Sequence, residues 1–114
     1  MLISVGEKLH VITRRLFDGD LRRHFAGVVT AVEGDIVRLE GYVFVFDTRT
    51  NTWDRRDERR TRIVGLGDSG HIIKVIPGEV DLRDLNYQMD ATRHLVVTDG
   101  KKFALDINEF GSQR

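Results

Sequence analysis

The chain has 114 residues, of which 40% are hydrophobic, and its 18 basic residues balance its 18 acidic residues. A chain of this length matches one domain and buries about two thirds of its surface, enough for a core without disulfides or metal. The absence of Cys excludes disulfides, thiolate metal sites and a Cys nucleophile. No apolar run reaches the roughly 18 residues of a membrane span, and the start lacks a secretory signal pattern. We therefore expect a cytoplasmic protein without membrane contact.

The zero net charge hides an uneven distribution along the chain. Residues 49–62 contain six Arg and three acidic residues, whereas residues 79–109 contain four basic and seven acidic residues. Most of the basic residues are Arg, whose planar guanidinium binds carboxylates and phosphates through paired hydrogen bonds. A GC-rich genome produces the same Arg excess without any functional cause. The sequence thus predicts one positive and one negative region.

Alternating apolar and polar residues predict strands along most of the chain. In the first strand, Leu9 and Val11 face one side while His10 and Ile12 face the other. Strands also end at clear turn signals such as Gly34-Asp35 and Pro77-Gly78. The expected strands are 7–14, 22–33, 36–47, 60–66 and 71–76, followed by a hairpin made of LVVT and KKFALDI.

The hairpin formed by 22–33 and 36–47 predicts the overall architecture. If Gly34 and Asp35 form its loop, one face is apolar throughout and consists of Ala26, Val28, Thr30, Val32, Val37, Leu39 and Val43. The other face is polar near the loop and then becomes aromatic, with Phe25, Tyr42, Phe44 and Phe46. A strand buried on both sides must curve, and Gly27 and Gly41 lie where the change occurs. The stretch also resembles the Gly-Val hairpin of SH3-like translation-factor modules, a pattern common to many hairpins that defines no family.

The last third of the chain contains the only helical candidate and a second hairpin. Leu82, Leu85 and Met89 have helical spacing, which predicts a short helix near 79–85. A tight turn at Asp99-Gly100 would place Val96 opposite Phe103 and His94 opposite Leu105. Together the elements predict an all-β, mainly antiparallel fold: a small closed or strongly curved β-barrel or sandwich of seven or eight strands. We expect a single domain over 1–110 and a disordered tail over 111–114.

No motif predicts catalysis, a cofactor or a metal. The segment GDSG at 67–70, followed by His71, resembles the nucleophile segment of chymotrypsin-like serine proteases. A turn is the favoured interpretation, because that fold needs about twice this length and no third group orients the His. The four His residues lack the spacing of metal ligands, and Asp18 and Asp20 offer too few oxygens for calcium. We therefore expect a protein that is not an enzyme and needs no cofactor.

The Arg-rich segment after Trp53 is the candidate binding surface. Guanidinium groups beside an aromatic ring are typical of sites for single-stranded nucleic acid or for an anionic peptide. Acidic neighbours, Asp54, Asp57 and Glu58, are expected to pair with some of these Arg residues. The candidate residues are Trp53, Arg55, Arg56, Arg59, Arg60 and Arg62, with Arg22 and Arg23 nearby if the sheet curves back.

Two functions follow from this surface. The charge separation and a free terminal strand at 102–108 predict a protein-interaction or self-associating module. The alternative is single-stranded nucleic-acid or other polyanion binding through the Arg-rich loop and the aromatic face, although the sequence pI of about 6.9 is low for that role. A small ligand held by Tyr42 and His10 in a barrel mouth is disfavoured, because small barrels are filled by their own side chains.

Overall fold

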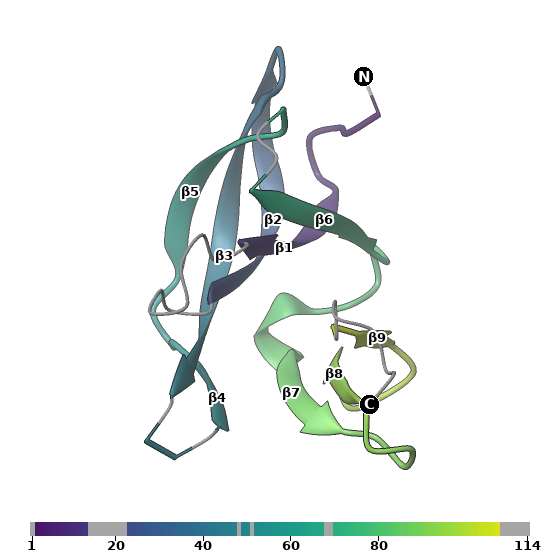
Figure 1. Ribbon diagram of the computed structural model, residues 1–114. Helices are drawn as coiled ribbons and strands as arrows, with labels where there is room; N and C mark the ends of the chain where they lie inside the picture. Colours follow the sequence, from purple (N-terminus) through teal and green to yellow (C-terminus); the bar gives the residue numbers. More distant parts are fainter. Residues whose placement is uncertain (1, 14–22, 48, 51, 68–69, 108–114) are drawn as a thin grey trace. The chain divides into compact units, whose positions relative to one another are not determined.

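The computed structural model describes residues 2–13, 23–47, 49–50, 52–67 and 70–107. Contacts within the chain group it into two compact units, residues 1–78 and residues 79–114. The described residues form nine strands, all paired antiparallel, which confirms the all-β antiparallel class (Figure 1). The single domain expected over 1–110 stays a prediction. Over the described residues, no helix has the length and apolar character needed to cross a membrane.

The first unit is one six-stranded sheet. Its order is β4-β3-β2-β1-β6, and β5 pairs with β3 beyond the end of β4. Neither sheet of the described residues closes on itself, so barrel closure stays a prediction. The strand that contains Trp53 and Arg55, β4, was not expected. The bounds are β1 (Lys8–Thr13), β2 (Arg23–Glu33), β3 (Ile36–Asp47), β4 (Thr52–Arg55), β5 (Arg60–Gly65) and β6 (His71–Ile76).

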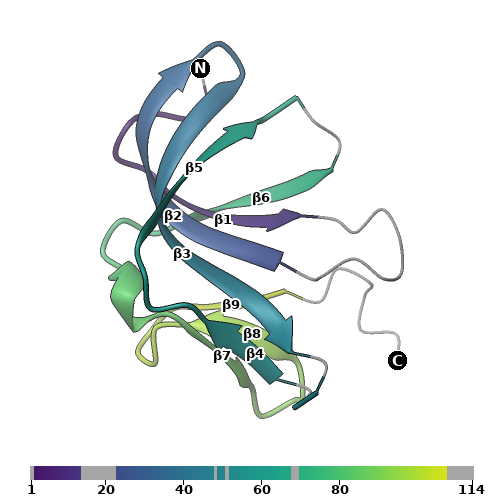
Figure 2. The ribbon, with the colours of Figure 1, turned by 90° about the vertical axis from the view of Figure 1, so that its left-hand side faces the viewer.

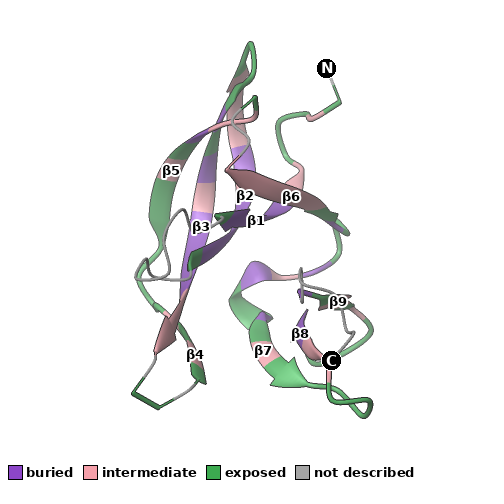
Figure 3. Ribbon diagram, in the orientation of Figure 1, coloured by how far each residue is buried: buried purple, intermediate pink, exposed green. Residues whose placement is uncertain are grey.

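The central strands β1, β2 and β3 are buried on both faces over part of their length (Figure 3). One face, here called the core face, carries a cluster of apolar side chains: Leu9, Val11, Phe25, Val29, Val37, Leu39, Val43 and Val64. On the opposite face, Tyr42 and Phe44 are also buried. The change from one-sided to two-sided burial along the hairpin is therefore confirmed. By the area rule, each fully buried apolar side chain of this kind stabilises the fold by about 1.5–3 kcal/mol.

The faces expected for the β2 residues that precede Ala31 are wrong, because the pairing of β2 with β3 shifts by one residue. Near the loop the pairing is as predicted, with Glu33 opposite Ile36. The register then shifts between Val29 and Ala31, which leaves Thr30 as an extra residue in β2. A bulge of this kind moves every side chain on the far side of it from the loop, here residues 23–29, to the other face.

The shift decides which aromatic residue enters the core. Phe25 lies on the core face, although the regular register placed it with Tyr42. Ala26 and Val28 take the opposite face instead, because they pair with Tyr42 and Glu40. A single bulged residue thus exchanges the two faces of β2.

Gly27 and Gly41 lie directly opposite each other where β2 and β3 approach closely. A Cβ atom on Gly41 would collide with the carbonyl oxygen of Ala26 and would lie 2.5 Å from the Cα of Gly27. A Cβ on Gly27 would lie 2.7 Å from the ring of Phe25. Both positions therefore require glycine for space rather than for a positive φ.

The second unit is a three-stranded sheet of β7 (Asn86–Met89), β8 (Leu95–Thr98) and β9 (Ala104–Asp106), in that order. The helix expected near 79–85 is a 3₁₀ turn at Leu82–Asp84, where the Asp81 carboxylate accepts a hydrogen bond from the Arg83 backbone. Leu82 and Leu85 are buried as expected. Met89 is exposed, because it lies in β7, which was not expected.

The register predicted for the last hairpin is wrong by three residues. Val96 lies opposite Asp106 rather than Phe103, so residues 99–103 form a five-residue loop. The Asp99 carboxylate accepts hydrogen bonds from the backbone N–H groups of Lys101 and Phe103, at 2.9 and 3.2 Å. Gly100 does adopt the positive φ of a turn glycine, at 77°. Side-chain bonding by Asp99 thus stabilises a wider loop than the two-residue turn.

Replacing Gly41 with Ala tests the close approach of β2 and β3. The added methyl must displace backbone atoms, so we expect Gly41→Ala to lower the free energy of unfolding by about 1–3 kcal/mol in urea titrations. Gly65→Ala is the matched control, because a Cβ at Gly65 meets nothing within 4 Å. Equal stability of the two variants would contradict the close approach.

Candidate functional site

The Arg-rich segment is an edge of the first sheet rather than a loop. β4 and β5 follow each other along the same side of β3 (Figure 2). Arg55 lies opposite Phe44 and Arg60 lies opposite Gly41, so residues 56–59 form a short excursion between the strands. The loop predicted over 55–62 is therefore limited to these four residues.

The candidate residues divide between the two faces of the sheet. Side chains alternate along β3, and residues directly opposite each other share a face. Arg60 and Arg62 lie on the core face, because they pair with Gly41 and Leu39. Arg23 lies on that face too, opposite Val45. Trp53 and Arg55 lie on the other face, opposite Phe46 and Phe44, and Arg22 lies outside the described residues.

Arg23, Arg60 and Arg62 form one positive group, here called the basic surface. The guanidinium of Arg62 lies over the ring of Phe25, 5.6 Å from its centroid. Partial burial lowers the pKa of Arg62, and the positive charges of Arg23 and Arg60 lower it further. The charge of Arg23 thus acts on the Arg-rich segment, which agrees with the proximity that the sequence predicted. Phe25, which the sequence placed with Tyr42 on the aromatic face, contributes its ring to the basic surface instead.

Within the described residues, the basic surface has a single ion pair. Arg60 lies 3.3 Å from the exposed carboxylate of Glu58. Among the described residues, no carboxylate lies within the 4.0 Å ion-pair distance of Arg23 or Arg62. A partly desolvated cation next to like charges is costly to hold in place. An arriving anion would remove that cost.

The other Arg residues of the segment do have acidic partners. The pairing predicted for Asp54, Asp57 and Glu58 is confirmed by Arg56–Asp54 at 3.5 Å, by Arg55–Asp57 at 3.7 Å and by the Arg60–Glu58 pair. Arg59 pairs with Glu40, 3.5 Å away, which was not predicted. At least one side chain of each pair is exposed, and exposed ion pairs contribute about 0–1 kcal/mol to the free energy of unfolding. The acidic partners lower the net charge of the segment, and the pairs add little to its stability.

The aromatic face is part of the packing of the first unit. Trp53 is half-buried, and its ring lies 4.3 Å from that of His24 and 5.6 Å from that of Phe46. Tyr42 is buried beneath the guanidinium of Arg55, 5.4 Å away. With Phe25 and Phe44 also buried, these rings do not offer the open stacking surface that nucleic-acid bases need.

Neither metal-binding residues nor comparisons with known proteins point to a second candidate site. The described residues contain no group of three or more His, Asp or Glu side chains that could hold a metal. Asp68 and Ser69 of the GDSG segment lie outside the described residues. A scan against family models gave no match, and searches of curated proteins and of solved structures found no similar protein. Function is therefore inferred from the basic surface itself.

Removing the charge of Arg62 tests the cost of the basic surface. We expect Arg62→Met to raise the free energy of unfolding at low salt, by less than about 1 kcal/mol, because it keeps the apolar stem and removes like-charge repulsion. Arg38→Met is the matched control, since Arg38 is exposed on the other face of the same sheet. Urea unfolding curves measure both. A loss of stability specific to Arg62→Met would show that the guanidinium stabilises the fold.

His10 predicts a dependence of stability on pH. Burial, and then the charge of Lys74, lowers the pKa of His10 from 6.5 to about 4. The unfolded chain therefore binds a proton at this residue below pH 6.5, while the folded chain does not until about pH 4. The free energy of unfolding should fall by up to about 3 kcal/mol over that range as the pH decreases. Urea titrations of His10→Gln should show a smaller fall, and an unchanged fall would contradict the assignment.

Proposed function

We propose that this chain is a non-enzymatic protein-interaction module whose basic surface holds an acidic segment of a partner protein. The observation that carries the proposal is Arg62, held over Phe25 and beside Arg23 and Arg60. Like charges are gathered there at a cost to the free protein, and a carboxylate partner offsets that cost on binding. Arg residues are suited to this role, because a guanidinium and a carboxylate form two parallel hydrogen bonds.

A protein partner is favoured over single-stranded nucleic acid for two reasons. Nucleic-acid sites combine basic groups with exposed rings, whereas Phe25, the ring on this surface, is buried, and Trp53 and Phe46 pack against each other on the opposite face. The sequence pI of about 6.9 also lacks the strong positive excess typical of nucleic-acid binding. Nucleic acid remains the alternative, because phosphates bind guanidinium groups as carboxylates do.

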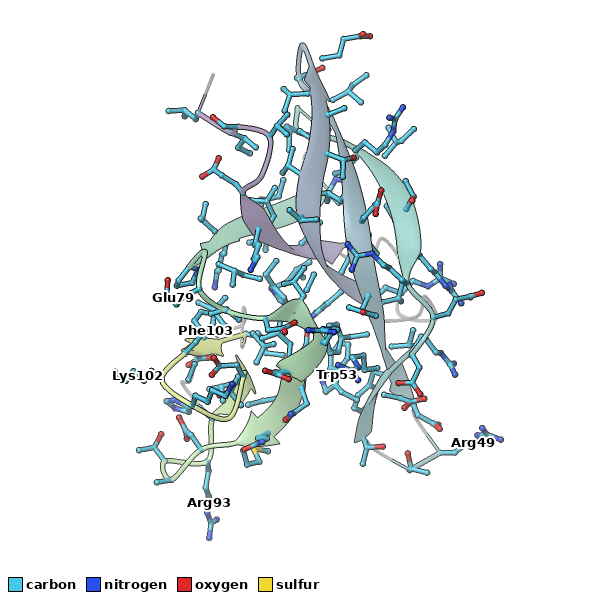
Figure 4. All side chains as sticks on the ribbon, turned by 180° about the vertical axis from the view of Figure 1, so that it is seen from behind. Arg49, Trp53, Glu79, Arg93, Lys102 and Phe103 are labelled. Carbon is cyan, nitrogen blue, oxygen red and sulfur yellow. The ribbon has the colours of Figure 1, made fainter. Side chains whose placement is uncertain are left out.

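Binding of a fluorescein-labelled acidic peptide, rich in Glu, tests the proposal by anisotropy. The triple variant Arg23→Gln, Arg60→Gln, Arg62→Gln should bind at least tenfold more weakly than the natural chain, because it loses the three cations of the basic surface. The matched control changes Arg38, Arg49 and Arg83 to Gln, which alters the net charge equally and leaves the three Arg residues of the basic surface in place. Arg49 and Arg83 form exposed ion pairs, and the Arg49 side chain extends outward (Figure 4). The control should bind within twofold of the natural chain.

Equal weakening in the two triple variants would overturn the proposal, because net charge alone would then explain binding. Single-stranded RNA and DNA oligomers of equal charge are titrated beside the peptide. If they bind more tightly and lose affinity only in the first variant, the nucleic-acid alternative replaces the protein partner. Urea unfolding of both variants verifies that each is folded.

A further inference from the structure

The outer side of β5 has no partner strand among the described residues. Its inner side pairs with β3. The backbone N–H of Leu66, just after β5, donates to the carbonyl oxygen of Asp35 at 2.6 Å, toward β3. Backbone groups of successive strand residues point to opposite sides. Those of Thr61 and Ile63 therefore point outward, where a further strand would bind.

The side chains of β5 divide in the same alternating way. Arg60 and Arg62 belong to the basic surface on the core face, while Thr61 and Ile63 lie on the other face. Ile63 is 68% exposed, and Ile36, on the same face, is 46% exposed. Arg60, Thr61 and Ile63 of β5 are exposed, whereas Val64 is buried (Figure 3). An approaching strand would meet cations on one face and apolar side chains on the other.

We propose that the partner's acidic segment binds as an additional strand, antiparallel to β5, with acidic and apolar residues in alternation. Its acidic side chains lie over the basic surface, and its apolar side chains cover Ile63 and Ile36. Backbone hydrogen bonds to Thr61 and Ile63 supply affinity that does not depend on side chains. This proposal rests on the proposed function and specifies how the partner is held.

Charge excludes a second copy of β5 as the occupant. In a two-fold antiparallel pair of β5 strands, the Arg60 and Arg62 side chains of one copy would lie against those of the other. Like charges on facing strands are destabilising, and charged edge strands resist pairing with themselves. The charge complement of this edge is an acidic segment rather than a second β5 strand.

Backbone methylation of a probe peptide separates strand addition from simple charge attraction. The probe is a labelled peptide of alternating Glu and Val. In the antiparallel arrangement the Val residues lie opposite Thr61 and Ile63, so their N–H groups point toward β5. We expect N-methylation of the Val residues to weaken binding at least tenfold. N-methylation of the Glu residues, whose N–H groups point away, should change affinity less than threefold.

A variant of the protein tests the same contact from the other side. Thr61→Pro removes an outward N–H and leaves the hydrogen bonds between β5 and β3, so it should weaken peptide binding at least tenfold. Thr61→Ala keeps the N–H and should bind as the natural chain does. Unfolding curves establish that both variants are folded. Amide exchange in the free protein should be fast at Thr61 and Ile63 and should slow when the peptide binds.

Each other outcome overturns a stated part of the proposal. If both methylated peptides bind as well as the unmodified peptide, charge alone holds the segment: strand addition fails and the proposed function survives. If only the Glu-methylated peptide loses affinity, the antiparallel direction is wrong. If no form of the peptide binds, the proposed function fails with it. Slow exchange at Thr61 and Ile63 in the free protein would show that this edge is already paired, as in a closed barrel.

Discussion

Uninterrupted alternation of side chains along β3 determines the faces of the strands beside it. Its odd-numbered residues, such as Leu39 and Val43, belong to the core, and its even-numbered residues, such as Phe44, face the other side. β5 takes its arginine face from this alternation, because Arg62 lies opposite Leu39. The basic surface therefore depends on Arg60 and Arg62, which occupy core-face positions in the edge strand β5. Phe25, on the central strand β2, has a buried ring, and the guanidinium of Arg62 lies over it.

Much of the first unit was predictable, because alternation and turn residues are local signals. The bounds of β1, β3 and β6 follow from them within about a residue, and Gly27 and Gly41 were recognised as special positions. The bulge at Thr30 was not predictable, because an extra residue leaves the apolar pattern of β2 almost unchanged. The loop at Asp99 was missed for a related reason: the Asp-Gly pair favours a tight turn locally, while carboxylate bonding to Lys101 and Phe103 favours a wider one.

The candidate site was predictable in composition but not in arrangement. The Arg-rich segment and the nearness of Arg23 could be expected from the sequence, whereas the division of the arginines between two faces could not. The division follows from the separate pairing of β4 and β5 with β3, and no local pattern in the Arg-rich segment specifies that pairing. The alternation of residues 60–65 does contain the relevant signal: charged side chains on one side and Thr61 and Ile63 on the other.

The excursion at 56–59 also has a consequence for how this chain tolerates insertions and deletions. Four residues there lie beside only two residues of β3, Tyr42 and Val43. Because of these two extra residues, the register of β4 with β3 does not determine the register of β5 with β3. Adding or removing a residue in the excursion therefore leaves the pairing of Arg60 unchanged. The connection between β4 and β5 can therefore vary in length while every side chain in β5 keeps its face.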